Sequence, residues 1–222
     1  MPDAEQVAKE HRERGMAYFE AGDFRAAIAE FNRAIHTAPD SRFVALAFYH
    51  RGLAYAALKE LSRAIADYTA AIRQDHTFLH AYFSRGDLYA ARGDYESALH
   101  DFDRVLELHT QYIQVLPADS EQVAPLNRLA LETHLSRANA YAALDNLTQA
   151  IEELSEVLRV ETQHLDACFS RAVLREKVND LAGALSDFEH YLAWGGGVRY
   201  GDQAQVEQKI AELQAQLGQA NA

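Results

Sequence analysis

Five segments of the chain repeat one pattern of small and aromatic residues, and this pattern constrains the fold more than any other feature. The clearest copy is Leu79–Tyr112. Its apolar and small residues follow each other at spacings of three, four and seven, which is typical of one face of a helix. The pattern is interrupted once, where Gly93 suits a left-handed C-cap and Asp94 suits the N-cap of a second helix. Each copy is therefore predicted to be two helices joined by a tight turn.

The five copies align at equal length and are numbered repeats 1 to 5, covering residues 8–41, 45–78, 79–112, 131–164 and 165–198. Position 8 is glycine or alanine in every copy, and position 20 is always alanine. Position 11 is tyrosine in all copies except the fifth, which has Arg175. Position 15 mostly holds residues that tolerate a left-handed backbone. The position-15 residues are Gly22, Lys59, Gly93, Asp145 and Asn179.

This pattern resembles the tetratricopeptide repeat (TPR) family, whose helix–turn–helix unit has small residues at positions 8 and 20 and aromatic residues at 11 and 24. The resemblance covers about three quarters of the chain. It implies an all-α fold: a right-handed superhelical solenoid of five helix–turn–helix units plus a C-terminal capping helix, or eleven helices. The family's tryptophan at position 4 is replaced in every copy, by His11, Phe48, Tyr82, His134 and Cys168.

The segments outside the repeats carry separate expectations. Residues 1–7 are expected to be a flexible leader, and residues 42–44 are expected to extend the first helix of repeat 2. The insertion 113–130 fits either a lengthened helical hairpin or a flexible loop. The hairpin is favoured because the apolar residues continue the helical spacing. In it, Ser120 is expected to be an N-cap and Pro125 to lie in or just before the first helical turn.

Residues 199–222 are predicted to be a loop followed by a capping helix. The glycines of Trp194–Gly201 fit a loop between helices, since they lack the spacing of a phosphate-binding loop. Asp202 is expected to cap the final helix. One apolar stripe, with polar residues elsewhere, suits a helix that closes the end of a solenoid; a dimerising coiled coil would need more than about two heptads. The stripe comprises Val206, Ile210, Leu213 and Leu217.

Composition narrows the function classes. The net charge of −12 disfavours a nucleic-acid partner and an anionic membrane surface, and favours a neutral or basic protein partner. No apolar run is long enough for a transmembrane helix, and the first residues lack the apolar segment of a signal peptide, so a cytoplasmic location is expected. Cys168, the single cysteine, is expected to be a small core residue. The ten histidines are scattered, so no metal site is expected. Neighbouring carboxylates point to different sides of their helices, so no enzymatic activity is expected, and no cofactor is expected either.

A pair of charged positions recurs in all five repeats. Position 7 is always arginine, and position 23 is always acidic. Both adjoin buried positions, so each arginine needs a partner for its charge. The sequence predicts a ladder of arginine–carboxylate pairs, within a repeat or between neighbouring repeats. Its members are Arg14, Arg51, Arg85, Arg137 and Arg171 with Glu30, Asp67, Asp101, Glu153 and Asp187.

The resemblance also implies a function and a site. TPR arrays hold a segment of another protein in a concave groove lined by positions 2, 5, 9 and 12 of the first helices. The implied function is a non-catalytic interaction scaffold or adaptor, present as a monomer or weak homo-oligomer. The family's chaperone-binding carboxylate clamp is not expected, because only Arg12 retains a comparable charge. The alternative is a self-assembling scaffold that uses the 113–130 hairpin or the terminal helix. The predicted groove residues are Met16, Tyr49, Leu53, Phe83, Asp87, Leu135, Asn139, Phe169 and Val173.

Overall fold

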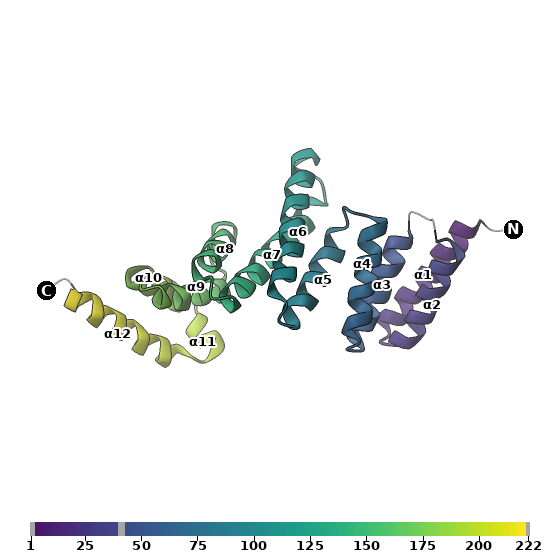
Figure 1. Ribbon diagram of the computed structural model, residues 1–222. Helices are drawn as coiled ribbons and strands as arrows, with labels where there is room; N and C mark the ends of the chain where they lie inside the picture. Colours follow the sequence, from purple (N-terminus) through teal and green to yellow (C-terminus); the bar gives the residue numbers. More distant parts are fainter. Residues whose placement is uncertain (1–2, 40–42, 221–222) are drawn as a thin grey trace. The chain divides into compact units, whose positions relative to one another are not determined.

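The structure, a computed structural model, describes residues 3–39 and 43–220. These residues form twelve α-helices and contain no β-strand (Figure 1). The chain divides into two compact units, the N-terminal unit Met1–Pro117 and the C-terminal unit Ala118–Ala222. The all-α class predicted from the repeat spacing is confirmed.

The N-terminal unit contains repeats 1 to 3. The two helices of each repeat pack against each other, α2 packs on α3, and α4 packs on α5. Its helices are α1 (Ala4–Glu20), α2 (Phe24–Thr37), α3 (Val44–Ala57), α4 (Leu61–Gln74), α5 (Leu79–Ala91) and α6 (Tyr95–Val115).

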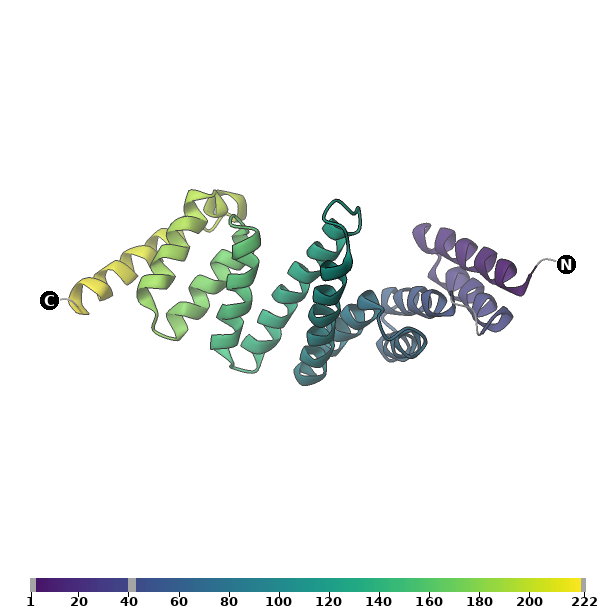
Figure 2. The same cartoon turned by 90° about the horizontal axis from the view of Figure 1, so that it is seen from above.

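The C-terminal unit contains repeats 4 and 5 and the terminal helix. Figure 2 shows α7 to α10 as neighbouring hairpins, and α12 packs against α10. Its helices are α7 (Val123–Ala143), α8 (Leu147–Val160), α9 (Leu165–Lys177), α10 (Leu181–Ala193), α11 (Gly196–Tyr200) and α12 (Gln203–Ala220).

The turn inside each repeat has one backbone conformation. All five position-15 residues have positive φ, including Lys59 at 63°. An aspartate follows the turn in three repeats, and its carboxylate accepts a hydrogen bond from a backbone N–H in the first turn of the second helix. For Asp94, the predicted N-cap, the donor is the N–H of Ser97, at 3.2 Å. The cap satisfies a donor that the helix leaves unpaired, so the second helix starts at a fixed residue.

The core of each hairpin lies between position 20 and position 24 of its second helix and position 8 of its first. The alanines at position 20 are fully buried, and the aromatic or leucine side chains at position 24 are also buried. A Cβ added at Gly86 would lie 2.8 Å from Cε1 of Phe102. The small residue therefore lets the ring of the second helix contact the first helix directly.

Several boundaries differ from the expectations. α1 begins at Ala4, inside the expected leader, because the segment continues the helical spacing up to buried Ala8; Met1 and Pro2 lie outside the described residues. α3 begins at Val44, and Arg42 also lies outside the described residues.

The insertion lengthens both helices that flank it. α6 continues to Val115, and α7 begins at Val123, so Pro125 lies in its first turn. Ser120 is not the N-cap of α7. Its hydroxyl accepts from the N–H of Gln122 at 3.3 Å, in the turn that precedes the helix.

The expected loop after repeat 5 contains a twelfth helix, α11, so the count of eleven was wrong. Gly195 and Gly201 flank α11 with φ of 84° and 74°, so two left-handed residues separate it from α10 and α12. A Cβ at Gly196 would overlap the ring of Tyr191. Asp202 directly precedes α12, and both its carboxylate oxygens lie 3.0 Å from the hydroxyl of Tyr191.

Candidate functional site

The predicted arginine–carboxylate ladder is present, and its pairs form within each repeat. Three pairs are bidentate, as in Arg51, whose Nε and Nη2 donate to Asp67 at 2.7 and 2.6 Å. The glutamate pairs are looser, with Arg14 and Arg137 each 3.2 Å from the carboxylate. Each arginine projects from the first helix to the second, so the pair fixes the two helices of a repeat in register.

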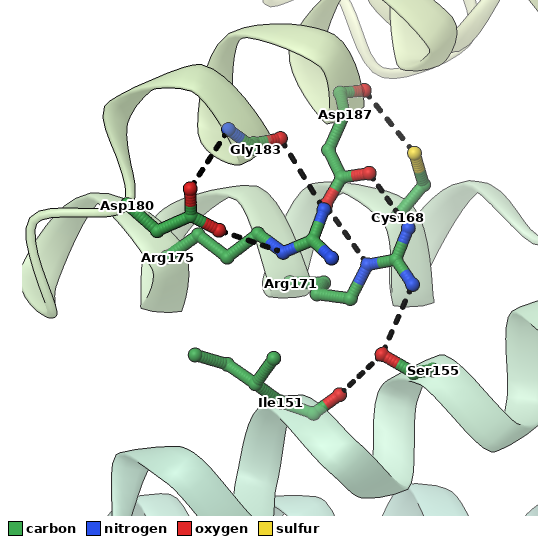
Figure 3. A network of polar contacts seen from close by, with 8 residues as sticks. All are labelled: Ile151, Ser155, Cys168, Arg171, Arg175, Asp180, Gly183 and Asp187. Carbon is green, nitrogen blue, oxygen red and sulfur yellow. Dashed lines mark hydrogen bonds and ion pairs between the residues drawn. The ribbon is translucent and has the colours of Figure 1, made fainter.

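Three of these arginines, Arg51, Arg85 and Arg171, also contact the preceding repeat. Nη1 of Arg171 donates to the hydroxyl of Ser155 at 3.0 Å, and that hydroxyl donates to the carbonyl of Ile151 at 2.7 Å (Figure 3). Nη1 of Arg85 donates in the same way to Thr69 at 3.0 Å. The partner is the position-25 side chain of the preceding repeat, and the repeat pattern did not predict this contact. The ladder therefore joins repeats as well as helices.

Cys168 lies beside this ladder in repeat 5 (Figure 3). It is 1% exposed, and its thiol donates to the backbone carbonyl of Asp187 at 3.1 Å. Burial, with the nearby charge of Asp187, raises the pKa of the thiol to about 11. A protonated, buried thiol is a poor nucleophile. The structural role expected for Cys168 agrees with this geometry.

Two histidines extend the ladder in repeats 1 and 4. Nδ1 of His11 lies 2.7 Å from Glu30, and Nδ1 of His134 lies 2.7 Å from Glu153. Burial raises the pKa of Glu30, but hydrogen bonds from His11 and Arg14 outweigh it, so the pKa is lowered. The sequence held a signal for these contacts. Position 4 is histidine only where position 23 is glutamate rather than aspartate.

The N-terminal unit holds five of the predicted groove residues, all half-buried. Tyr49 packs against the rings of Tyr68 and Phe78, with centroids 5.7 and 4.9 Å apart. Phe83 packs at 6.0 Å on Phe102, the core residue of its own repeat. These rings are thus partly core and partly surface. The half-buried residues are Met16, Tyr49, Leu53, Phe83 and Asp87.

His50 lies among these residues, and no sequence pattern predicted a role for it. Its ring lies 5.8 Å from that of Phe31, and burial together with the charge of Arg12 lowers its pKa to about 4. Its buried Nδ1 has no hydrogen-bond partner among the described residues. The imidazole is therefore neutral at physiological pH. His50 occupies position 6 of its repeat, and a neutral imidazole there does not suit the recognition of a carboxylate.

The C-terminal unit brings three of its four predicted groove residues to one hollow. The hollow has a volume of about 220 Å³ and lies between α7, α8 and α9. Asn139 is exposed at its edge, while Phe169 and Val173 are half-buried and pack on the core. Leu135 packs on the same core but does not line the hollow. The lining residues are Ala138, Asn139, Ala142, Leu154, Phe169, Ser170, Val173 and Leu174.

Metal ligands and membrane-spanning helices were sought in the described part of the chain. Within residues 3–39 and 43–220, no three His, Cys, Asp or Glu side chains lie close enough together to hold a metal ion. No helix within the same ranges is both long and apolar enough to span a bilayer.

Comparison with known proteins identifies the repeats of the N-terminal unit. Two family models described as tetratricopeptide repeat match residues 12–77 and 80–112, which are repeats 1 to 3. The chain contains tetratricopeptide repeats. Repeats 4 and 5, which contain the hollow and two pairs of the ladder, lie outside the residues that these models match. No curated protein matches the chain.

Solved TPR solenoids share this fold. MamA has a TM-score of 0.69 and 16% identity, over 86% of this chain and 93% of MamA. PilF from Pseudomonas aeruginosa has a TM-score of 0.65 and 17% identity, over 98% and 93%. YrrB, described as a TPR protein with an unusual peptide-binding site, has a TM-score of 0.67 and 15% identity, over 88% and 90%. Proteins of the TPR fold are generally non-catalytic interaction scaffolds.

Proposed function

We propose that the protein is a non-catalytic, cytoplasmic adaptor that binds a segment of a partner protein through the hollow between α7, α8 and α9. The observation that carries this proposal is the convergence of Asn139, Phe169 and Val173 on one hollow of about 220 Å³. Most of its lining residues are apolar, and Asn139 and Ser170 supply polar groups. Apolar concavities with a few polar groups are typical of sites that hold a side chain of a ligand.

The chemistry of the partner follows from the charges of the predicted groove positions and of the whole chain. Glu132 and Asp166 occupy groove positions of α7 and α9 and are exposed. The whole chain has a net charge of −12. A partner segment with an apolar anchor and basic flanking residues would fit the hollow and be attracted to its surroundings. YrrB supports a peptide as the ligand by its description alone.

The test introduces a bulky side chain at the hollow and leaves the core residues unchanged. Asn139→Trp places a large ring at the edge of the hollow, whereas Asn127→Trp makes the same change at another exposed site on α7. Both variants should keep the melting temperature of the wild type. A partner is first captured from the native cell with the wild type, then titrated in purified form. Asn139→Trp should weaken its binding by about tenfold or more, a loss of roughly 1.4 kcal/mol. Equal binding to both variants contradicts the proposal.

A self-assembling scaffold is the second candidate. Val115, in the 113–130 segment, is 77% exposed at the end of α6, so its apolar side chain is available for contact with a second copy of the chain. The terminal helix offers less, because its stripe already packs on the core of the C-terminal unit. Light scattering over a concentration series distinguishes the candidates. A defined oligomer that dissociates in the Val115→Glu variant supports the self-assembling scaffold. A monomer at every concentration supports the adaptor.

A further inference from the structure

A second, larger pocket opens at the end of repeat 5, away from the lining of the hollow. Its volume is about 380 Å³, within the range of sites for small molecules. It lies between the start of α9 and the segment that contains α11. Its lining residues are Gln163, His164, Leu165, Asp166, Trp194, Arg199 and Tyr200.

Opposite charges line this pocket without neutralising each other. The carboxylate of Asp166 accepts a hydrogen bond from the hydroxyl of Tyr200. The guanidinium of Arg199 lies over the ring of Tyr200, 5.6 Å from its centroid. Among the described residues, no ion pair joins Arg199 to a carboxylate. Tyr200 thus contacts the carboxylate of Asp166 through its hydroxyl and the guanidinium of Arg199 through its ring.

The remaining walls are flat rings and N–H donors. Trp194 stacks on His190 with centroids 5.2 Å apart and planes 15° apart, so its indole is held in a fixed orientation. Nδ1 of His164 accepts from the N–H of Ala167 at 3.2 Å and caps α9. A neutral imidazole that accepts at Nδ1 carries its proton on Nε2, where it is a donor.

We infer that this pocket binds a small zwitterion, an α-amino acid with an aromatic side chain. Its carboxylate would pair with Arg199, its ammonium group with Asp166, and its ring would contact Trp194 or Tyr200. A ligand that is only an anion would lie close to Asp166, and one that is only a cation would lie close to Arg199. A molecule that carries both charges avoids either repulsion. This pocket shares no lining residue with the proposed partner-binding hollow. Asp166 also adds negative charge to the predicted groove, but the zwitterion is inferred from the pocket alone.

Binding can be measured by the intrinsic fluorescence of Trp194, because it is the only tryptophan in the chain. The probe is L-phenylalanine, which absorbs too weakly to obscure indole emission, added to the full chain. A saturable change in Trp194 fluorescence is expected. N-acetyl-L-phenylalanine lacks the ammonium group, and L-phenylalanine amide lacks the carboxylate. Each should bind about tenfold more weakly or worse, the loss of one charge-assisted contact.

Variants then assign the two charges. Arg199→Gln should weaken L-phenylalanine about tenfold and abolish its advantage over the amide, whereas Asp166→Asn should abolish its advantage over the N-acetyl form. Asparagine can still accept from Tyr200, so the wall keeps its shape. Arg73→Gln, an exposed arginine at the end of α4, is the matched control and should bind as the wild type does. No saturable fluorescence change, or an analogue that binds as tightly as L-phenylalanine, overturns the inference.

Discussion

Arg85 and Asp101 form a bidentate ion pair across the two helices of repeat 3. Nε and Nη2 of Arg85 donate to the two carboxylate oxygens at 2.8 and 2.7 Å, and Asp101 is 1% exposed. The third nitrogen of the guanidinium donates to Thr69 of repeat 2 at 3.0 Å. Only arginine offers three donors in this planar arrangement, so lysine would not replace it at position 7.

Loss of this arginine should be costly, because it leaves a buried carboxylate without its partner. We expect Arg85→Ala to lower the free energy of unfolding by about 3–5 kcal/mol. Arg92→Ala, at the exposed end of the same helix, should change it by less than about 0.5 kcal/mol. Urea unfolding of both variants measures the difference. Equal stabilities would mean that the pair contributes nothing to holding the repeat together.

The turn of repeat 2 offers a stabilising change. Lys59 has φ of 63°, a conformation that strains a residue with a Cβ, while Gly22 and Gly93 occupy the same position in repeats 1 and 3. Lys59→Gly should therefore raise the free energy of unfolding by about 1 kcal/mol. The reverse change, Gly93→Lys, should lower it by a similar amount, since open space around Gly93 leaves only backbone strain. Thermal melts of the pair test both signs, and a destabilised Lys59→Gly would contradict the argument.

Periodic features were predictable from the sequence because five copies report each of them independently. The turns, the buried alanines and the partners of Arg51 or Arg171 all recur at fixed positions, and all are present. Features that occur only once in the chain were not predictable from the sequence. Nothing in the sequence distinguishes the glycines of α11 from those of a loop, since Gly196 is required by the ring of Tyr191 rather than by a turn.

The residues that line the hollow were predictable only in part, for a different reason. Repeat positions indicate which face of a first helix a residue occupies, but not how deeply its neighbours cover it. Asn139, Phe169 and Val173 line a hollow, whereas Leu135 packs beside it. The pocket around Arg199 combines a repeat with the irregular segment after it, so no repeat position predicts it.

Acid should destabilise the N-terminal unit through His50. Its pKa is about 4 in the folded protein, below the value of about 6.5 in an unfolded chain. Between these values only the unfolded chain takes up the proton. The contribution to stability is therefore complete above about pH 6.5, is lost as the pH falls toward 4, and is worth up to about 3 kcal/mol.

The variant His50→Gln should remove this dependence. The free energy of unfolding, measured from pH 7 to pH 4, should fall less steeply for His50→Gln than for the wild type. His76→Gln, at an exposed histidine, is the control and should follow the wild-type slope. If His50→Gln keeps the wild-type slope, protonation of this imidazole is not coupled to unfolding.

The terminal helix should stabilise the C-terminal unit as a cap. Val206 and Leu213 are 3% and 0% exposed, and both belong to the apolar core that repeats 4 and 5 share. Leu213→Ala should lower the free energy of unfolding by about 2–5 kcal/mol, because it leaves a cavity at a closed end of that core. Gln214→Ala, exposed on the same helix, should leave it nearly unchanged.

Deletion of 201–222 should lower the melting temperature further, since it uncovers the apolar face of α10. A truncated chain that melts with the full-length protein would show that α12 does not act as a cap.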